Sequence, residues 1–261
     1  MTKEISMDDK VMDILLKYRE EYIKNFSWSW LDEYPLSMKN ANKSLLASIL
    51  DFQMDADLVW KNAEILTEEV FKDPKNLWNY ILEKYPNKED WDSFLLEQKK
   101  KGFSIHRFDW ATKKIWEVAK EIVKDYNGDS RNIWKDFNSK EELIENIKKA
   151  IVTKSDTIPR MIILALNEKK HIKIKSDVKP DIHVKKVIGR LYFGSEVNEK
   201  KALEITRKLS PENPGILDNP LYMIGKNICK KEPECEACRL NQICEYRKNH
   251  NNLLQPKVSE T

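Results

Sequence analysis

The stretch GKNICKKEPECEACRLNQICEY, residues 225–246, contains every cysteine of the chain. The cysteines have the spacing C-x5-C-x2-C-x5-C, and a segment this short can bring four thiolates to one metal centre. Structural zinc sites more often have two C-x2-C pairs, whereas this segment has one close pair between two single cysteines. A [4Fe–4S] cluster takes four thiolates and tolerates such spacing. The pattern favours this cluster over zinc, disulfides or free thiols; the ligands are Cys229, Cys235, Cys238 and Cys244.

The N-terminal residues and the apolar runs of the chain bear on its location. The N-terminal MTKEISMDDK carries charges of both signs and no apolar core, unlike a signal peptide. The longest apolar run, MIILAL at 161–166, is far shorter than the ~20 residues that span a bilayer. We therefore expect a cytoplasmic protein with no membrane contact, associated with the nucleoid if the cell is prokaryotic. In such a reduced compartment, clustered cysteines more often hold metal than form disulfides.

The charge of the chain is unevenly placed. The 261 residues are 41% hydrophobic, which suffices for one large core or two modest ones, and the net charge is only +3. Residues 158–190, however, hold nine Lys or Arg against three Asp or Glu, a local charge of +6. Such a stretch fits a surface that faces a polyanion such as nucleic acid. From charge alone, a solvated helix face explains it equally well.

Apolar residues recur with helical spacing along almost the whole chain. One stripe follows Asp8, which we expect to cap the first helix, and a strong stripe ends at Asn127-Gly128, a typical helix stop. Alternation of period two is confined to IKIK at 172–175. The pattern predicts an all-α protein, with helices near residues 11–22, from 45, 58–70, 76–84, 88–99, 110–123, 143–151, 159–167, 181–193, 198–209 and 217–227.

Two further segments hold polar residues at helix boundaries. In SDVKPDIHVKKVIGRLYFG, residues 176–194, Asp181 precedes an apolar-periodic stretch and is expected at the N-cap or in the first turn. Taken alone, an aspartate there caps a helix far more often than it catalyses. In LLASILDFQMDADLVWKNA, residues 45–63, Gln53 falls on a turn between two helices, where a plain polar loop residue is the simplest interpretation.

The order of these three segments resembles that of the helix-hairpin-helix (HhH-GPD) DNA glycosylases of the endonuclease III type. That family has a leucine-rich helix ending in a turn whose glutamine enters the DNA stack. A V-D-T-H-V-like segment with a catalytic Asp follows, and then G-R-x-x-C and C-x6-C-x2-C-x5-C. Here LLASILDFQ, KPDIHVKKV and GKNIC match in that order, over about residues 41–246. Lys226 replaces the usual arginine, and the first cysteine gap is one residue shorter.

The resemblance implies two helical domains with a DNA-binding cleft between them. One domain would be a helical bundle at 42–155, and the other would join 1–41 to 156–261, with the hairpin region and the iron–sulfur loop. The implied activity is a monomeric DNA glycosylase that acts on double-stranded DNA with a flipped target base, which is damaged, mismatched or modified. Gln53 would fill the gap in the stack, and Asp181 would assist hydrolysis of the N-glycosidic bond.

The resemblance also implies the DNA contacts. The cysteine loop would bind phosphate through Lys226, Lys230 and Lys231. The hairpin of the family reads roughly L-P-G-V-G-x-K, with glycines that let backbone amides approach a phosphate. This chain has AIVTKSDTIPRMIILAL at 150–166 instead, with no glycine between Gly128 and Gly189. The polar residues that could replace some of these contacts are Ser155, Thr157 and Arg160.

The hairpin bears on mechanism as well. In family members that cut the strand, a lysine just after the hairpin glycines attacks the sugar as a Schiff-base nucleophile. Here Ile158, Pro159 or Arg160 takes that place, and arginine stays protonated. Lys154 is the nearest substitute, so the sequence favours a monofunctional glycosylase. The alternatives are a bifunctional glycosylase/AP lyase, a non-catalytic iron–sulfur DNA-binding protein, and a zinc-stabilised nucleic-acid adaptor.

Overall fold

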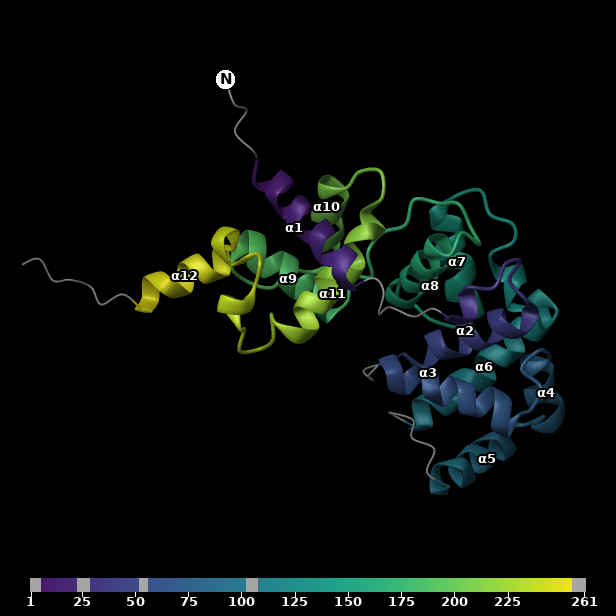
Figure 1. The fold of residues 1–261 in the computed structure, drawn as a ribbon. Helices are drawn as coiled ribbons and strands as arrows, with labels where there is room; N and C mark the ends of the chain where they lie inside the picture. The colour runs from purple at the N-terminus through teal and green to yellow at the C-terminus, as the bar shows by residue number, and fades with distance from the viewer. Residues whose placement is uncertain (1–5, 23–28, 52–55, 102–107, 255–261) are drawn as a thin grey trace, which may run out of the picture. The chain divides into compact units, whose positions relative to one another are not determined.

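The structure is a computed structural model that describes residues 6–22, 29–51, 56–101 and 108–254. These residues form helices and contain no strand, so the expected all-α fold is confirmed. No helix among them is both long enough and apolar enough to cross a membrane. The chain divides into two compact units, which we call the central unit, residues 28–174, and the terminal unit, residues 1–27 with 175–261 (Figure 1). The functional domains expected at 42–155 and at 1–41 with 156–261 stay a prediction.

The central unit is built around α2 (Met38–Leu50), whose residues 41–50 are all buried. This helix begins seven residues before the expected start, because Ser37 caps it by accepting the Asn40 N–H. Its first half escaped the apolar pattern because the buried residues there are partly polar. Around α2 lie η2 (Ser29–Leu31), α3 (Ala56–Glu64), the π-helical η3 (Ile65–Val70), α4 (Leu77–Lys84), α5 (Lys88–Lys100), α6 (Phe108–Tyr126), η4 (Ser130–Ile133), α7 (Lys140–Ala150) and α8 (Thr157–Glu168).

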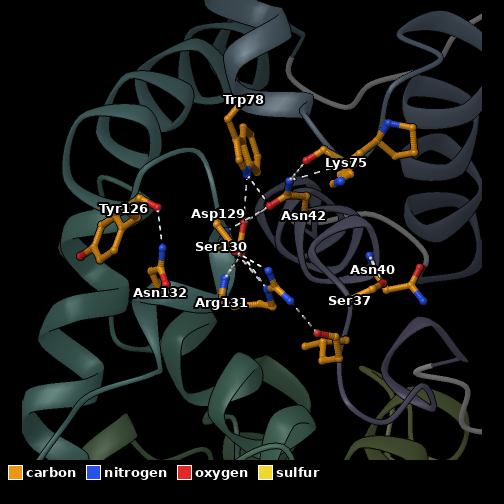
Figure 2. A network of polar contacts seen from close by, with 12 residues as sticks. Ser37, Asn40, Asn42, Lys75, Trp78, Tyr126, Asp129, Ser130, Arg131 and Asn132 are labelled. Atoms are coloured by element: carbon orange, nitrogen blue, oxygen red, sulfur yellow. Dashed lines mark hydrogen bonds and ion pairs between the residues drawn. The ribbon is translucent and has the colours of Figure 1, made fainter.

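Asn42 on α2 explains how a polar residue fits into this core (Figure 2). Its side-chain oxygen accepts from Trp78 Nε1 at 3.0 Å and from Ser130 Oγ at 2.7 Å, and its amide donates to the Lys75 carbonyl at 2.9 Å. The three side chains of Asn42, Trp78 and Ser130 are fully buried. A buried network with every member bonded fixes the relative placement of α2, α4 and η4.

Lys43, the next residue of α2, is only 3% exposed. Its ammonium pairs with Glu68 on η3 at 2.9 Å and lies 4.4 Å from the centre of the Trp30 ring. The Trp30 ring in turn lies 4.7 Å from that of Trp60. A buried cation needs such partners, so this cluster ties η2, α2, α3 and η3 together.

The terminal unit brings the first helix next to the last ones. Its helices are α1 (Met7–Tyr22), α9 (Ile182–Phe193), α10 (Glu199–Leu209), η5 (Pro214–Leu217), α11 (Asp218–Asn227), η6 (Cys235–Ala237), η7 (Asn241–Ile243) and α12 (Glu245–Leu254). Purple α1 lies beside the green helices α10 and α11 in Figure 1. The core contains Val11 and Leu15 of α1, Val184 and Ile188 of α9, and Leu221 of α11. The mostly polar α12 packs on α9 and was not predicted from the sequence.

The expected N-cap at Asp8 is wrong. Helix α1 begins at Met7, and the hydroxyl of Ser6 accepts the Asp9 N–H at 3.1 Å. The Asp8 carboxylate instead accepts the Tyr192 hydroxyl of α9 at 2.9 Å and pairs with Lys208 of α10 at 2.9 Å. The Lys208 ammonium lowers the pKa of Asp8, partly opposed by burial, and the Tyr192 hydroxyl lowers it further. Tertiary contacts therefore decided the role of this residue.

Candidate active site and cysteine loop

Asp181 is the N-cap of α9, as expected. Its backbone is extended (φ −75°, ψ −175°), and its side chain accepts the N–H groups of His183 at 2.8 Å and Val184 at 3.0 Å. Both hydrogen bonds end on Oδ1, so the cap uses only one of the two carboxylate oxygens. The side chain is partly exposed. Asp181 can therefore cap the helix and interact with a substrate at the same time.

A glycine lets α11 approach the first turn of α9. A Cβ at Gly225 would lie 2.7 Å from the Cβ of His183, which is closer than two carbons can pack. The His183 ring meets Tyr222 of α11 edge to face at 5.2 Å, and the Lys226 ammonium lies 5.7 Å from the centre of the Tyr222 ring. His183 is thus a packing residue, and the contact brings Lys226 to the end of α9 that carries Asp181.

The four cysteines have different neighbours in their loop. Cys229, Cys238 and Cys244 pack against the hydrophobic core of the terminal unit. Cys235 instead lines an open pocket of about 440 Å³, together with Tyr246 and other residues of the loop and α12. All four are free thiols. All four are partly exposed, and three of them also contact the core of the terminal unit.

Burial, with a smaller contribution from the three other cysteines, raises the pKa of Cys238 to about 11, although a backbone hydrogen bond with Leu240 opposes the shift. Burial also raises the pKa of Cys244, although backbone N–H groups of Arg247 and Tyr246 oppose the shift. Such thiols stay protonated at neutral pH unless a metal binds and stabilises the thiolate. No His, Cys, Asp or Glu group within the described ranges is gathered closely enough to hold a single metal ion. The four cysteines lie in one short loop without a disulfide, and four thiols are a donor set of the kind that an iron–sulfur cluster takes.

Arg190 of α9 organises this loop and was missed in the sequence. Its Nη1 donates to the Lys230 carbonyl at 2.6 Å and to Cys229 Sγ at 3.5 Å, and Nη2 reaches the Lys231 carbonyl at 3.4 Å. The guanidinium also lies 4.6 Å from the centre of the Tyr246 ring. An arginine within the apolar stripe of α9 was the available signal, because a buried cation needs partners.

The lysines of the loop lie on its outer side. Lys230 is half exposed and forms an ion pair with Glu234 at 2.8 Å. Lys231 is exposed, and only its carbonyl is used by Arg190. An exposed pair of this kind is weak, so Lys230 can exchange Glu234 for another anion.

Helices α7 and α8 form the helix–turn–helix at the expected hairpin. Two backbone hydrogen bonds close the end of helix α7. The Val152 N–H donates to the Lys149 carbonyl at 3.1 Å, and the Thr153 N–H donates to the Lys148 carbonyl at 3.0 Å. These bonds define a Schellman motif, which requires a left-handed residue, and Val152 fills that place with φ +50°. The hairpin thus forms without glycine, at the cost of a left-handed β-branched residue.

The polar residues of the turn bond mainly to one another. Ser155 Oγ accepts the Thr157 N–H at 3.2 Å and donates to the Thr157 hydroxyl at 3.1 Å. The Ser155 N–H donates to the Thr153 hydroxyl at 3.3 Å. Lys154 is exposed at the tip. The structure therefore brings Ser155, Thr157 and Lys154 together on one turn.

Arg160 points back into its own unit. Its guanidinium pairs with Asp156 at 3.2 Å, and its side chain is 10% exposed. Lys148 of α7 also reaches Asp156, at 3.3 Å. This arrangement fastens the start of α8 to α7 and keeps Arg160 away from solvent. Gln53, the expected residue of the DNA stack, lies outside the described residues.

No family model and no curated protein matches the chain. Solved structures match over nearly its whole length. A trapped covalent endonuclease III–DNA intermediate, an estranged-adenine complex, has a TM-score of 0.59 at 17% identity, over 94% of this chain and 99% of that chain. A non-covalent endonuclease III–DNA complex has the same score and identity, over 95% and 99%. A thermostable thymine-DNA glycosylase reaches 0.58 at 17% identity, over 93% and 97%.

The chain has the endonuclease III fold. At 17% identity the likeness establishes the fold alone, and the activity has to be argued from this chain's own residues. Within this endonuclease III fold, the terminal unit carries Asp181 and the cysteine loop, and the central unit carries the α7–α8 hairpin.

Proposed function

We propose that the protein is a DNA glycosylase that hydrolyses the N-glycosidic bond of a damaged, mismatched or modified base in double-stranded DNA. The observation that carries the proposal is Asp181, a carboxylate at the head of α9 whose cap uses one oxygen only. Support comes from the fold, which solved endonuclease III–DNA complexes and a thymine-DNA glycosylase share. Because the proposed substrate is DNA, we expect the protein to be located where the cell keeps its DNA. We expect it to act as a monomer.

The chemistry follows from the charge that develops during the reaction. A target nucleotide leaves the stack at a cost of about a few kcal/mol, and Gln53 would fill the gap. Breaking the N-glycosidic bond builds positive charge on the sugar. The Asp181 carboxylate stabilises that charge, or takes a proton from the attacking water. The two hydrogen bonds from His183 and Val184 fix the orientation in which it does so.

Cys229, Cys235, Cys238 and Cys244 would hold a [4Fe–4S] cluster. The cluster would supply cross-linking of a segment that otherwise contains only short 3-10 turns, η6 and η7. Arg190 would hold the loop against α9 through the carbonyls of Lys230 and Lys231. The residues of this region that would bind and orient DNA are Lys226, Lys230 and Lys231.

Lys226, Lys230 and Lys231 would contact phosphate, and salt dependence tests this directly. Lysines on phosphates displace condensed counterions, so the affinity for duplex DNA falls steeply with salt. Lys230→Ala with Lys231→Ala should flatten the log–log salt slope by about two units. The matched control is Lys200→Ala with Lys201→Ala, another adjacent lysine pair, in which Lys201 pairs with Glu204 at 2.8 Å. Equal slopes for both double variants would remove the loop lysines from the interface.

The activity itself is tested on a panel of damaged, mismatched and modified duplexes. The proposal expects intact abasic strands that break only after alkali or heat, and no covalent adduct with borohydride. A trapped adduct would show a lyase, with Lys154→Ala as the first variant to examine, because endonuclease III itself has been trapped on DNA covalently. Release of no base from any duplex, with binding retained, would instead indicate a non-catalytic DNA-binding protein.

A further inference from the structure

The five residues that precede Asp181, Ser176 to Pro180, form what we call the lead-in segment. This segment has no helix or strand of its own, yet Ser176, Asp177, Val178 and Pro180 are buried. An extended segment with no internal ladder has to be held from outside if the residue that follows it is to keep one position. The contacts of the segment show which side chains hold it.

The first anchor is the ion pair of Asp177 with Arg207. The Asp177 carboxylate is 1% exposed and accepts two hydrogen bonds from the guanidinium of α10, from Nε at 2.8 Å and Nη2 at 2.7 Å. Two parallel bonds fix both distance and angle, which a single ammonium does not. The start of the lead-in segment is thereby fastened to α10.

The second anchor lies next to Asp181. Asp218, the first residue of α11 and 9% exposed, accepts the backbone N–H of Lys179 at 2.5 Å. The carbonyl of the same Lys179 accepts the N–H of Asp181 at 2.8 Å. Asp218 therefore holds the N–H of Lys179, and the carbonyl of that same residue bonds to the backbone of Asp181. Between the anchors, Val178 is fully buried, and the Ser176 carbonyl accepts the Gly215 N–H at 3.0 Å.

We propose that Asp218 and Arg207 are positioning residues for Asp181. They set the place of its carboxylate relative to the sugar without contacting the substrate, an inference that rests on the proposed glycosylase function. Displacement of a reacting group by about 1 Å costs on the order of 10²-fold in rate. The anchors would therefore affect the chemical step more than DNA binding, which depends on other residues of the protein.

Two variants of Asp218 separate positioning from general stability. Asp218→Asn keeps a side-chain oxygen for the Lys179 N–H, whereas Asp218→Ala removes it. In single-turnover assays we expect Asp218→Ala to lower base release about 10- to 100-fold with the Kd for DNA within about threefold. Asp218→Asn should keep the rate within about threefold of the wild type. Equal rates for the two variants would overturn the role of Asp218.

Arg207→Lys tests the other anchor, because lysine keeps the charge but loses the two-bond geometry. The control is Tyr192→Phe, which removes one hydrogen bond, to Asp8, near the other end of α9. We expect slower base release from Arg207→Lys and an unchanged rate from Tyr192→Phe. A rate loss common to both would mean that the terminal unit responds to any lost contact, and would refute positioning by Arg207.

A second readout keeps this inference separate from the function. The amides of His183 and Val184 are protected by Asp181, so a displaced carboxylate lets them exchange with solvent faster. We expect exchange at these two amides to rise about tenfold or more in Asp218→Ala and not in Tyr192→Phe. If the wild type releases no base but this difference is found, the anchors stand and the proposed function fails. Unchanged exchange in Asp218→Ala refutes the positioning inference whatever the activity.

Discussion

The head of α9 and the turn between α7 and α8 are both polar breaks before a helix, yet they are built in opposite ways. At the head of α9, Asp181 occupies a relaxed extended conformation and its segment is anchored by α10 and α11. In the hairpin turn, Val152 is left-handed, and Ser155 and Thr157 bond to each other. The first region holds one carboxylate in a defined place, and the second satisfies its own polar groups. The difference teaches that the head of α9 fixes one side chain through contacts from other helices, whereas the hairpin turn is stabilised by its own residues.

Removing one of the four cysteines should have the largest effect on stability. The effect should be confined to the terminal unit and leave the central unit unchanged. Protein purified without oxygen should be yellow-brown and hold about four iron atoms per chain. Cys235→Ser should lose that iron and destabilise the terminal unit, because cluster binding contributes to folding. Hydrogen exchange in α7 and α8 should stay as in the wild type. Stoichiometric zinc without iron in anaerobic preparations would refute the iron–sulfur cluster. An equal loss of protection from hydrogen exchange in both units would refute the contrast between them.

Asp181→Asn should have the next largest effect. Asparagine keeps the capping oxygen but removes the negative charge, so thermal stability should change little while base release falls ~10²–10⁴-fold. DNA binding should persist. Lys154→Ala at the hairpin tip should leave the rate unchanged. If Lys154→Ala abolishes base release and Asp181→Asn does not, the chemistry belongs to the hairpin and the comparison is reversed.

Replacing the left-handed residues that follow α7 and α9 should have a smaller effect. The two replacements should change the stability of the protein in opposite directions. Both helices end in a left-handed residue, Val152 with φ +50° and Gly194 with φ +70°. Val152→Gly should stabilise the protein by about 0.5–1 kcal/mol, since a β-branched residue is strained there. Gly194→Val should destabilise it by about 1–2 kcal/mol, and its side chain would also meet Asn249. Chemical denaturation of each variant measures both values, and a destabilising Val152→Gly would show that the valine side chain packs well enough to outweigh the strain.

The ion pair of Asp8 with Lys208 should have the smallest effect. The folded pKa of Asp8 is lowered, so its contribution to stability is complete above its ordinary value of 3.8 and is lost as pH falls through the lowered value. Asp8→Asn should lower the melting temperature by about 1–2 °C at pH 7, and the two proteins should converge as pH falls through the lowered pKa of Asp8. A difference in melting temperature that persists once Asp8 is protonated would assign the effect to the Tyr192 hydrogen bond instead.

The sequence alone determined the all-α class, most helix positions and the cap at Asp181, and the cysteine ligand set stays a prediction from the sequence. These features follow from short-range rules: apolar spacing, a capping side chain and a ligand spacing can be read within one segment. The stop at Asn127-Gly128 is such a case, because both residues adopt the left-handed conformation that asparagine and glycine tolerate best. The resemblance to endonuclease III also rested on local segments, and the fold that it implied is confirmed despite 17% identity.

Only the tertiary structure decided the features that join segments far apart in the chain. The Asp8 carboxylate bonds to Tyr192 and Lys208 instead of capping its own helix. The partly polar first half of α2 is buried because Trp78 and Ser130 form hydrogen bonds with Asn42. Arg190 bonds to a loop carbonyl 40 residues further along the chain, and Asp218 bonds to the N–H of Lys179, two residues before Asp181. The physical reason is that a buried polar group must find a partner, and the partner's identity depends on which helices pack together. Local patterns predict that such a group needs a bond, and the fold determines where the bond is made.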